Sequence, residues 1–515
     1  MAFILAFSSG IISTLTPYVT SSFQSHSLTA LTGVISSLVS GLWKLPYAKI
    51  MDVWGRPQAL SLMVASVTLG LIMMAGCNNV ATYCAAQVFY YLGYLGIDFS
   101  ITVFIADSSK LKNRGFMIAF AASPWLVTTW IYGYAANNIL APDGMGYRWG
   151  FGVFAIVVPL VCAPWIVLMW LKQIKAIKMG LVPNRPASGK TFAQSALYYA
   201  TQFDVVGLLI LATGLALFLL SFNLYSLQAD QWRSPMIICF VIFGGLLIIA
   251  FALWEKFLAP ATFVPWPLLK NRTVVGTMTM ALALYTGWYI WDSYFYSLLI
   301  VLFNQSIVHA TYISNIYTIG SCFICLVYGI CLRYYGKLKW YSLFWGAPLT
   351  ILGVGLMIAF RQPNVNIGYI VMCQIFVAFG GGVLVISEQT TLMAVSKQGD
   401  VPALLAVESM VIAVGSAIGS TIAGAMWTGI FPAQLTRRLP ADALSNFAEI
   451  YGDFTVQSSY PVGSPTRDAI NESYAYTQRY MLIGATCIYL TMLLSIALWQ
   501  NVDVKKQKQR TYGLL

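Results

Sequence analysis

Apolar runs recur along the whole chain and are separated by short polar segments. Each run is about 20 residues long, which is enough to cross the hydrocarbon core of a bilayer as one helix. The alternating ten-residue pattern of a membrane β-barrel is absent from the sequence. The pattern therefore predicts an all-α polytopic membrane protein with fourteen spans. We expect these spans at residues 2–21, 28–50, 58–77, 83–106, 115–139, 150–171, 204–225, 235–254, 274–302, 309–332, 341–360, 367–394, 402–430 and 480–499.

The composition agrees with this class. Of the 515 residues, 59% are hydrophobic and 9% are charged, whereas an ordinary soluble domain has about 25% charged residues. The first run begins at Met1, is rich in Ser and Thr, and has no basic segment ahead of it. Because a secretory signal needs such a segment, we expect a first membrane helix that lacks its usual cytoplasmic lead.

The basic residues indicate an orientation, because Lys and Arg accumulate in the cytoplasmic loops of membrane proteins. If the loop 51–57 is cytoplasmic, twenty-one of the 29 Lys and Arg residues lie on that side. The same choice places the C-terminus in the cytoplasm. The net charge of +12 then follows from this bias toward an anionic leaflet, and no nucleic acid partner is expected.

Two loops carry the same pattern at an offset of 281 residues. The matched residues are Ala48, Asp52, Gly55 and Arg56 in AKIMDVWGR, and Gly329, Arg333, Gly336 and Lys337 in GICLRYYGK. The same offset carries Asp107 onto Glu388. Such a duplication is typical of secondary transporters, whose two halves move about a site near the middle of the membrane.

The repeat predicts two six-helix halves with two helices inserted between them, a 6+2+6 arrangement. The expected units are residues 1–171 for the first half, 172–203 for a cytoplasmic loop, 204–254 for the inserted helices, 255–430 for the first five helices of the second half, 431–479 for a long extracellular loop, 480–499 for the last helix and 500–515 for a cytoplasmic tail.

The repeated loop resembles the signature of the major facilitator superfamily, in its fourteen-helix form. Several further stretches resemble the fungal siderophore-iron transporters within it. These are PYVTSSF at 17–23, DVWGRPQAL at 52–60, IADSSKLKNRG at 105–115, VPWPLLKNRTV at 264–274, YFYSLLIVLFNQSIVHATYISNIYTIGS at 294–321, FRQPNVNIGYI at 360–370, FGGGVL at 379–384, LPADAL at 439–444 and YPVGSPTRDAINESYAYTQR at 460–479. The resemblance implies a monomeric, proton-coupled importer of ferric siderophores, chiefly hydroxamates, in the plasma membrane or, alternatively, an endosomal vesicle.

The driving force is expected to be a gradient, because the sequence has no GxxxxGK[ST] loop and no soluble domain for ATP binding. Proton coupling requires an acid that can gain and lose a proton within the membrane. The candidates are Asp98, Asp292 and Glu408. Asp98 follows Gly93 and Gly96, so the alternative for it is a tight helix contact with the carboxylate hydrogen-bonded across it.

Charges at the cytoplasmic ends of helices predict a gate between the halves. The group consists of Asp52, Arg56, Asp107, Arg114, Arg333, Lys337 and Glu388. Ion pairs among them would form when the carrier faces outward and separate when it opens inward. The alternative is that these charges only cap helix ends and set the topology.

An aromatic face surrounds one acid in the span 274–302, which opens the second half. Helical spacing brings together Tyr285, Trp288, Tyr289, Asp292, Phe295 and Tyr296, whereas Trp291 and Tyr294 point elsewhere. The resemblance implies that this helix lines the central cavity. The alternative is an aromatic belt, but belts lie at the membrane interface and this face extends over three turns.

The extracellular loop is the last candidate region. Its candidate residues are Tyr451, Tyr460, Arg467, Tyr474 and Tyr476. The resemblance implies that the loop captures or gates substrate, and the alternative is a passive glycosylated lid. The chain has two His residues and scattered Cys residues, so we expect no metal site and no cofactor. A ferric siderophore needs neither, since its own groups already satisfy the iron and the carrier grips the organic shell.

Two other functions fit parts of the sequence. A fourteen-helix exporter of drugs or other small molecules has similar loop motifs, but it lacks the tyrosine-rich loop and the stretches quoted above. A sensor or truncated carrier without transport is favoured by the short N-terminus and disfavoured by the intact charges of both gate loops. None of these functions is enzymatic.

Overall fold

The computed structural model describes residues 1–22, 43, 44, 46–51, 53–140, 143–180, 191, 194, 198, 200, 201, 204–225, 228, 230–259, 270–396, 401–452 and 454–505. Most of these residues are helical. Within these ranges, extended backbone pairs at one isolated antiparallel bridge, between Lys337 and Asp503. The prediction of an all-α fold is confirmed.

Following the expected 6+2+6 arrangement, we divide the helices of the described residues into three consecutive groups. The first half consists of α1 (Ala2–Ser22), α3 (Arg56–Ala75), α4 (Val80–Ser108), α5 (Leu111–Ala122), α6 (Trp125–Leu140) and α7 (Gly146–Lys178). The inserted group consists of α9 (Val205–Leu224), η2 (Gln231–Arg233), α10 (Pro235–Leu253) and η3 (Trp254–Leu258). The second half consists of α12 (Arg272–Asp292), α13 (Phe295–Val301), α14 (Ile307–Ser314), α15 (Ile316–Tyr335), α16 (Leu338–Tyr341), η4 (Ser342–Gly346), α17 (Ala347–Phe360), α18 (Ile367–Val395), α19 (Val401–Arg438), η6 (Leu444–Asn446), α20 (Phe447–Gly452), α21 (Phe454–Ser459) and α22 (Pro465–Ala497).

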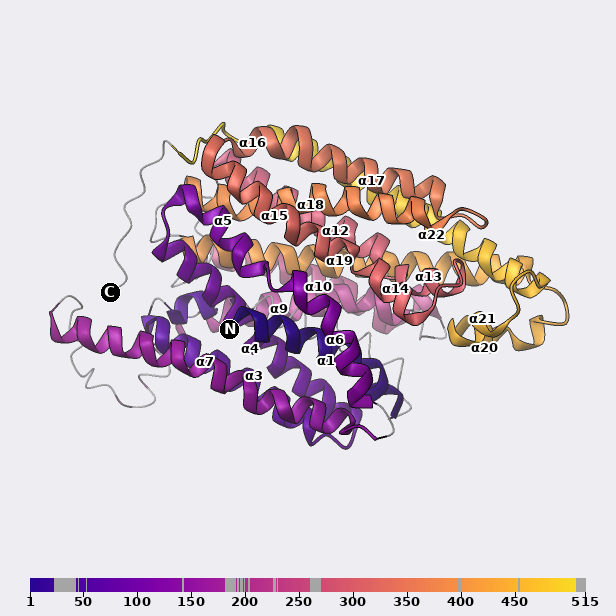
Figure 1. Cartoon of the computed structure of the whole chain (residues 1–515), viewed down its shortest axis with the longest axis horizontal. Coiled ribbons are helices and arrows are strands. Elements are labelled where there is room, and N and C mark those ends of the chain that lie inside the picture. The colour runs from indigo at the N-terminus through magenta and orange to yellow at the C-terminus, as the bar shows by residue number, and fades with distance from the viewer. Residues whose placement is uncertain are drawn as a thin grey trace.

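In Figure 1 the helices run roughly along the long axis of an elongated bundle, with the first half in indigo and purple below the second half in salmon, orange and yellow. α16 lies at one end, which we call the tail end because residues 499–505 also lie there. α20 and α21 lie at the opposite end, which we call the loop end. α9 packs against α10 and against α19, so the inserted pair is attached to the second half.

The chain is a multi-pass membrane protein. In the described ranges, ten helices are long and apolar enough to cross a bilayer. Most of the predicted span 28–50 lies outside the described residues, so the number of fourteen stays a prediction. Many large apolar side chains point outward, for example Phe243, Leu246 and Ile249 of α10, as expected where lipid replaces water.

Polar caps begin several helices where the apolar runs predict them. Asn79 accepts a hydrogen bond of 2.8 Å from the backbone N–H of Thr82 at the start of α4, and Asn366 caps α18 in the same manner. These side chains satisfy N–H groups that have no partner within the helix. Such caps allow helix starts to be predicted closely.

Within the described residues three predicted spans are interrupted, and the span 309–332 breaks at Asn315 between α14 and α15. The span 115–139 breaks between α5 and α6 at Ser123 and Pro124, because proline has no N–H and its ring clashes with the preceding turn. The span 274–302 breaks between α12 and α13, at Ser293 and Tyr294. Neither residue is a helix breaker, so the break between α12 and α13 has a tertiary cause, which is described below.

The predicted extracellular loop 431–479 is shorter in the structure. α19 continues to Arg438 and α22 begins at Pro465, so Tyr474 and Tyr476 belong to a helix. The boundary was predicted wrongly because the first turns of α22 are polar. Several of these polar residues, including Arg467, are buried against other helices. Hydropathy does not predict such burial, because the residues are polar.

The halves meet along α5, α6 and α15. Near the tail end, Gly329 of α15 approaches α5 so closely that a Cβ atom there would lie 2.7 Å from the Cα of Phe116. Toward the loop end, the hydroxyl of Tyr132 donates to Oδ1 of Asn315 over 3.2 Å. These contacts join the two halves, and Asn315 also lines the site described next.

Candidate functional site

The break between α12 and α13 is held by Arg361, at the end of α17. The Arg361 side chain is fully buried, and its Nη1 donates to the carbonyl oxygen of Trp291 over 2.9 Å. Nη1 also donates to Oε1 of Gln478, in α22, over 2.7 Å. A carbonyl in the last turn of a helix has no intrahelical donor. The guanidinium supplies that donor and so stabilises the interruption.

The same guanidinium lies over aromatic rings. Its central carbon is 4.4 Å from the centroid of the Phe295 ring and 5.5 Å from that of Trp291. Arg361 and Asp292 also interact electrostatically. A buried charge is costly unless hydrogen bonds, an opposite charge or a ring face compensate for it, and Arg361 has all three. It therefore holds the backbone at the end of α12, directly before Asp292.

Asp292 lines a cavity of about 250 Å³ between α12, α13, α14 and α15. One wall is aromatic, with Trp288 stacked on Tyr317 at a centroid distance of 5.3 Å. The facing residues are polar. The complete lining is Trp288, Asp292, Tyr296, Ser314, Asn315, Tyr317 and Thr318. The arrangement suits an organic ligand that stacks on rings and exchanges hydrogen bonds with hydroxyl and amide groups.

Two polar atoms in this lining have no protein partner. Among the described residues, Nε1 of Trp288 and Oγ of Ser314 are buried and make no hydrogen bond. Buried donors are almost always satisfied in native proteins, so such exceptions mark strained or functional positions. Both can donate to an oxygen-rich ligand if the entry of that ligand displaces the atoms that now cover them.

The predicted aromatic face is divided between three places. Trp288, Asp292 and Tyr296 line the cavity, whereas Phe295 is buried beneath Arg361. Tyr285 interacts electrostatically with Glu388 and Glu408. Phe295 does not line this cavity, since its ring lies under the Arg361 guanidinium.

Trp291 and Tyr294 point away from the cavity, as predicted. The indole Nε1 of Trp291 donates to the hydroxyl of Tyr489 over 3.1 Å. The ring of Tyr294 stacks on Trp427 at 4.1 Å. Both side chains therefore join the second half's core.

The candidate coupling acids lie in two groups. Asp292 belongs to the cavity, whereas Asp98 and Glu408 both interact electrostatically with Lys44. Asp98 is exposed in spite of its place within α4, and Glu408 is 2% exposed. The close helix contact beside Asp98 is made by Gly93 and Gly96 against α3.

The gate group contains one ion pair among its described residues. Arg56 and Asp107 approach to 2.9 Å, and both belong to the first half. Arg114 is buried, and its Nε donates to the carbonyl oxygen of Ser109 over 3.3 Å. Asp52 lies outside the described residues.

The second-half members of the gate group are separated. Arg333 and Lys337 are exposed at the tail end, where the backbone of Lys337 pairs with that of Asp503. Glu388 is fully buried and interacts electrostatically with Glu408 instead. The offset of 281 residues relates Arg56 to Lys337 and Asp107 to Glu388 in sequence. The ion pair of the first half is not repeated in the second half, since Lys337 is exposed and Glu388 is buried beside Glu408.

The outer-loop residues form a second buried network. Nη1 of Arg467 donates to the carbonyl oxygens of Gln457 and Tyr460, at 2.8 and 3.2 Å. Its Nη2 donates to the carbonyl oxygen of Val301 in α13, over 2.7 Å. The hydroxyl of Tyr474 donates to Oε1 of Gln457 over 2.7 Å. The segment after α21 is thus fastened to the helix that follows the break.

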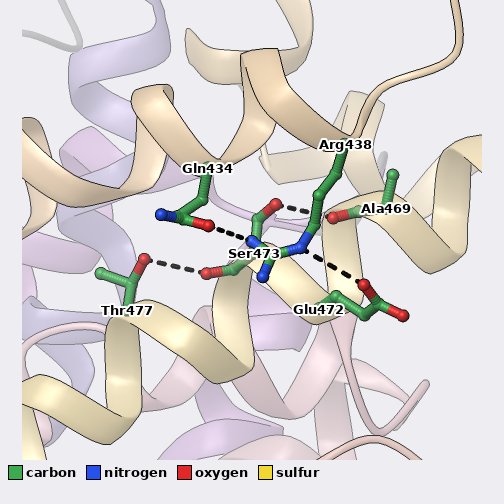
Figure 2. Close-up of polar contacts among 6 residues, drawn as sticks. All are labelled: Gln434, Arg438, Ala469, Glu472, Ser473 and Thr477. Carbon is green, nitrogen blue, oxygen red and sulfur yellow. Dashed lines mark hydrogen bonds and ion pairs between the residues drawn. The ribbon is translucent and has the colours of Figure 1, made fainter.

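A surface clip joins α19 and α22 near this network. Figure 2 shows Arg438 between Gln434 and Glu472, with Nε of Arg438 3.3 Å from a carboxylate oxygen of Glu472. The ring of Tyr476 lies under the same guanidinium, at 5.3 Å. Tyr451 stacks in parallel on Phe447 at 6.1 Å. Tyr451 and Tyr474 also pack on Phe431 of α19, so these aromatic residues join the loop end to α19.

The sequence profile of the Major Facilitator Superfamily matches residues 1–420. The chain is 52% identical to MFS siderochrome iron transporter 1 of Ajellomyces capsulatus, over 99% of this chain and 86% of that protein. The chain belongs to the siderophore iron transporters of the Major Facilitator Superfamily. A second member of this family, Siderophore iron transporter mirB of Emericella nidulans, is 40% identical over 99% of this chain and 84% of its own length.

Solved structures of the superfamily share the fold. The human organic anion transporter MFSD10 superposes with a TM-score of 0.56 at 12% identity and 97% coverage of both chains. The proton:xylose symporter XylE superposes with a TM-score of 0.54, also at 12% identity and 97% coverage of both. At this identity the likeness concerns the fold alone.

Two residues of this family member's site escaped the sequence analysis. Arg361 follows an apolar run and was assigned to a loop, although it is buried. Lys44 falls within the expected span 28–50, and the sequence alone assigns it no role. A cation inside or directly beside an apolar run is a functional signal by itself, and that signal could have identified both.

Proposed function

We propose that this protein is a secondary active importer of ferric siderophores, driven by protons, with hydroxamate chelates as the main substrates. The observation that carries the proposal is the cavity at the α12–α13 break, where Trp288 and Ser314 present buried, unpartnered polar atoms. A hydroxamate chelate displays carbonyl oxygens and apolar arms. The cavity offers donors and ring faces for both.

The size of the cavity favours partial insertion. About 250 Å³ is smaller than the usual range for a drug-sized ligand, about 300–1,000 Å³. One arm of a bulky chelate therefore enters between Trp288 and the polar wall, and the remainder lies between the halves. Asp292 accepts hydrogen bonds from the ligand, with Arg361 holding it in position.

The remaining expectations form part of the same proposal. Fourteen helices are arranged as 6+2+6, the tail end faces the cytoplasm, and the monomeric carrier works in the plasma membrane, with a vesicle as the alternative. The gate group, with Asp52, Arg56, Asp107 and Arg114 in the first half, closes the tail end. The segment 439–464 covers the loop end and admits substrate.

The deciding experiment is uptake of iron-labelled hydroxamate siderophore by an iron-starved host that lacks its own siderophore carriers. We expect accumulation of label that a protonophore abolishes. Export of label would favour the exporter hypothesis, and no transport by correctly inserted protein would favour a sensor; either result would refute the proposal.

A further inference from the structure

One cation interacts with two acids, and a third acid interacts with one of these two. Lys44, from the first half, interacts electrostatically with Asp98 of α4 and with Glu408 of α19. Glu408 also interacts with Glu388 of α18. Because Lys44 interacts with an acid of each half, its preferred position depends on how the two halves are arranged relative to each other. α4 and α19 are in contact, so the cluster spans the interface.

The charges of this cluster do not balance. Fully ionised, three carboxylates and one ammonium carry a net charge of −2. Glu388 is fully buried and Glu408 is 2% exposed. In the described part of the chain, both carboxylate oxygens of Glu388 and Oε1 of Glu408 have no hydrogen-bond partner. Two adjacent buried carboxylates cannot both stay ionised without such partners, so the pair holds a proton.

No other cation reaches the cluster among the described residues. The neighbouring titratable groups are Tyr285 of α12, which interacts with both glutamates, Tyr317 and Cys325 of α15, which interact with Glu388, and Tyr94, which interacts with Asp98. None of these groups supplies a positive charge. Lys44 is therefore the counter-ion for which the acids of the two halves compete.

We propose that Glu388 and Glu408 form one proton-binding site. Protonation of this site changes the partner of Lys44, which pairs with Glu408 when Glu408 is ionised and with Asp98 when Glu408 is protonated. When Glu408 takes up a proton it becomes a neutral carboxyl, and the Lys44 ammonium pairs with Asp98. When the proton leaves, the Glu408 carboxylate attracts Lys44 again. The exposed Asp98 gives water access to the exchange. This inference rests on the proposed proton-driven import and assigns its coupling site.

The test compares two transport modes of purified protein in liposomes, with an iron-labelled hydroxamate siderophore as the probe. Accumulation is driven by a pH gradient across the membrane. Equilibrium exchange is measured with equal siderophore on both sides and no gradient. Carriers that lose proton coupling while keeping their binding site retain exchange and lose accumulation. The variants are Glu408→Gln, Glu388→Gln and Lys44→Met, with exposed Asp143→Asn as the control.

We expect each of the three variants to lose gradient-driven accumulation by about tenfold or more, a typical size for a coupling effect, while exchange stays close to that of wild type. Asp143→Asn should keep both modes. Unchanged accumulation in Glu408→Gln and Glu388→Gln would overturn the proposal, as would equal loss of exchange in monodisperse preparations of both. Failure of the wild-type protein to accumulate label would instead reject proton-driven import itself.

Discussion

Nη1 of Arg361 donates a hydrogen bond of 2.9 Å to the carbonyl oxygen of Trp291, at the point where α12 ends beside the cavity. Arg361, which follows α17, thereby stabilises a helix break that the sequence of α12 alone does not predict. Trp288 and Asp292 before the break and Tyr296 after it line the same cavity.

Replacing Arg361 should therefore damage both stability and binding. Arg361→Gln leaves the Trp291 carbonyl and Gln478 without their donor, at a cost of about 1.5–3 kcal/mol for each hydrogen bond lost to a charged group. Thermal unfolding of the purified protein measures this loss, and Arg361→Lys should recover only part of it, because an ammonium lacks the planar fork. Arg233→Gln, at an exposed position, is the control. An unchanged melting temperature in Arg361→Gln would contradict the account.

Asp292→Asn should weaken substrate binding rather than coupling, because the proposed proton site lies at Glu388 and Glu408. Loss of a charge-assisted hydrogen bond of about 1.5–3 kcal/mol corresponds to a rise in KM of roughly 10- to 150-fold. Accumulation and equilibrium exchange should fall together and should be restored together at high siderophore concentration. Selective loss of accumulation would instead make Asp292 the proton carrier.

The sequence predicts the part of the site that lies on one helix. Spacing of 3.6 residues brings Trp288, Asp292 and Tyr296 to one face, and all three line the cavity. Tyr285, Tyr289 and Phe295 belong to the same predicted face but not to the lining, and the break after Asp292 depends on an arginine 70 residues away. Local periodicity cannot contain that information.

The central cluster illustrates the same limit. Lys44, Asp98, Glu388 and Glu408 each attract notice as charges in or beside apolar runs, but the sequence does not show which of them meet. The repeat associates Glu388 with Asp107, at the end of its span. The structure buries Glu388 beside Glu408, because the partners of each helix are set by packing between the halves.

Gly329→Leu should slow transport by preventing close approach of α5 and α15 at the tail end. A Cβ atom at this position would lie 2.7 Å from the Cα of Phe116, and a backbone atom cannot move aside as a flexible side chain can. We expect a lower maximal uptake rate with little change in KM, since the cavity is remote from this contact. Gly355→Leu is the matched control, because its Cβ would meet no atom within 4 Å. Equal rates in the two variants would refute a role for this contact.

Arg467→Gln should release the segment 447–460 from α13. Three backbone carbonyls lose their donor, and breaking a buried charged group out of its network costs about 3–5 kcal/mol. Hydrogen exchange should rise in α20 and α21. Arg438→Gln is the control, because its ion pair with Glu472 is partly exposed and such pairs contribute about 0–1 kcal/mol. Equal exchange in both variants would show that Arg467 does not fasten the loop.

The most direct test of the account is equilibrium binding of an iron-labelled hydroxamate siderophore to purified protein, compared between wild type and Trp288→Ala. Removing the stacked indole and its unpartnered N–H should raise the Kd by about tenfold or more, equivalent to about 1.4 kcal/mol, while Trp345→Ala, at an exposed position, should bind like wild type. The absence of saturable binding to the wild-type protein, or equal affinity of Trp288→Ala and wild type, would contradict the assignment of this cavity to the substrate.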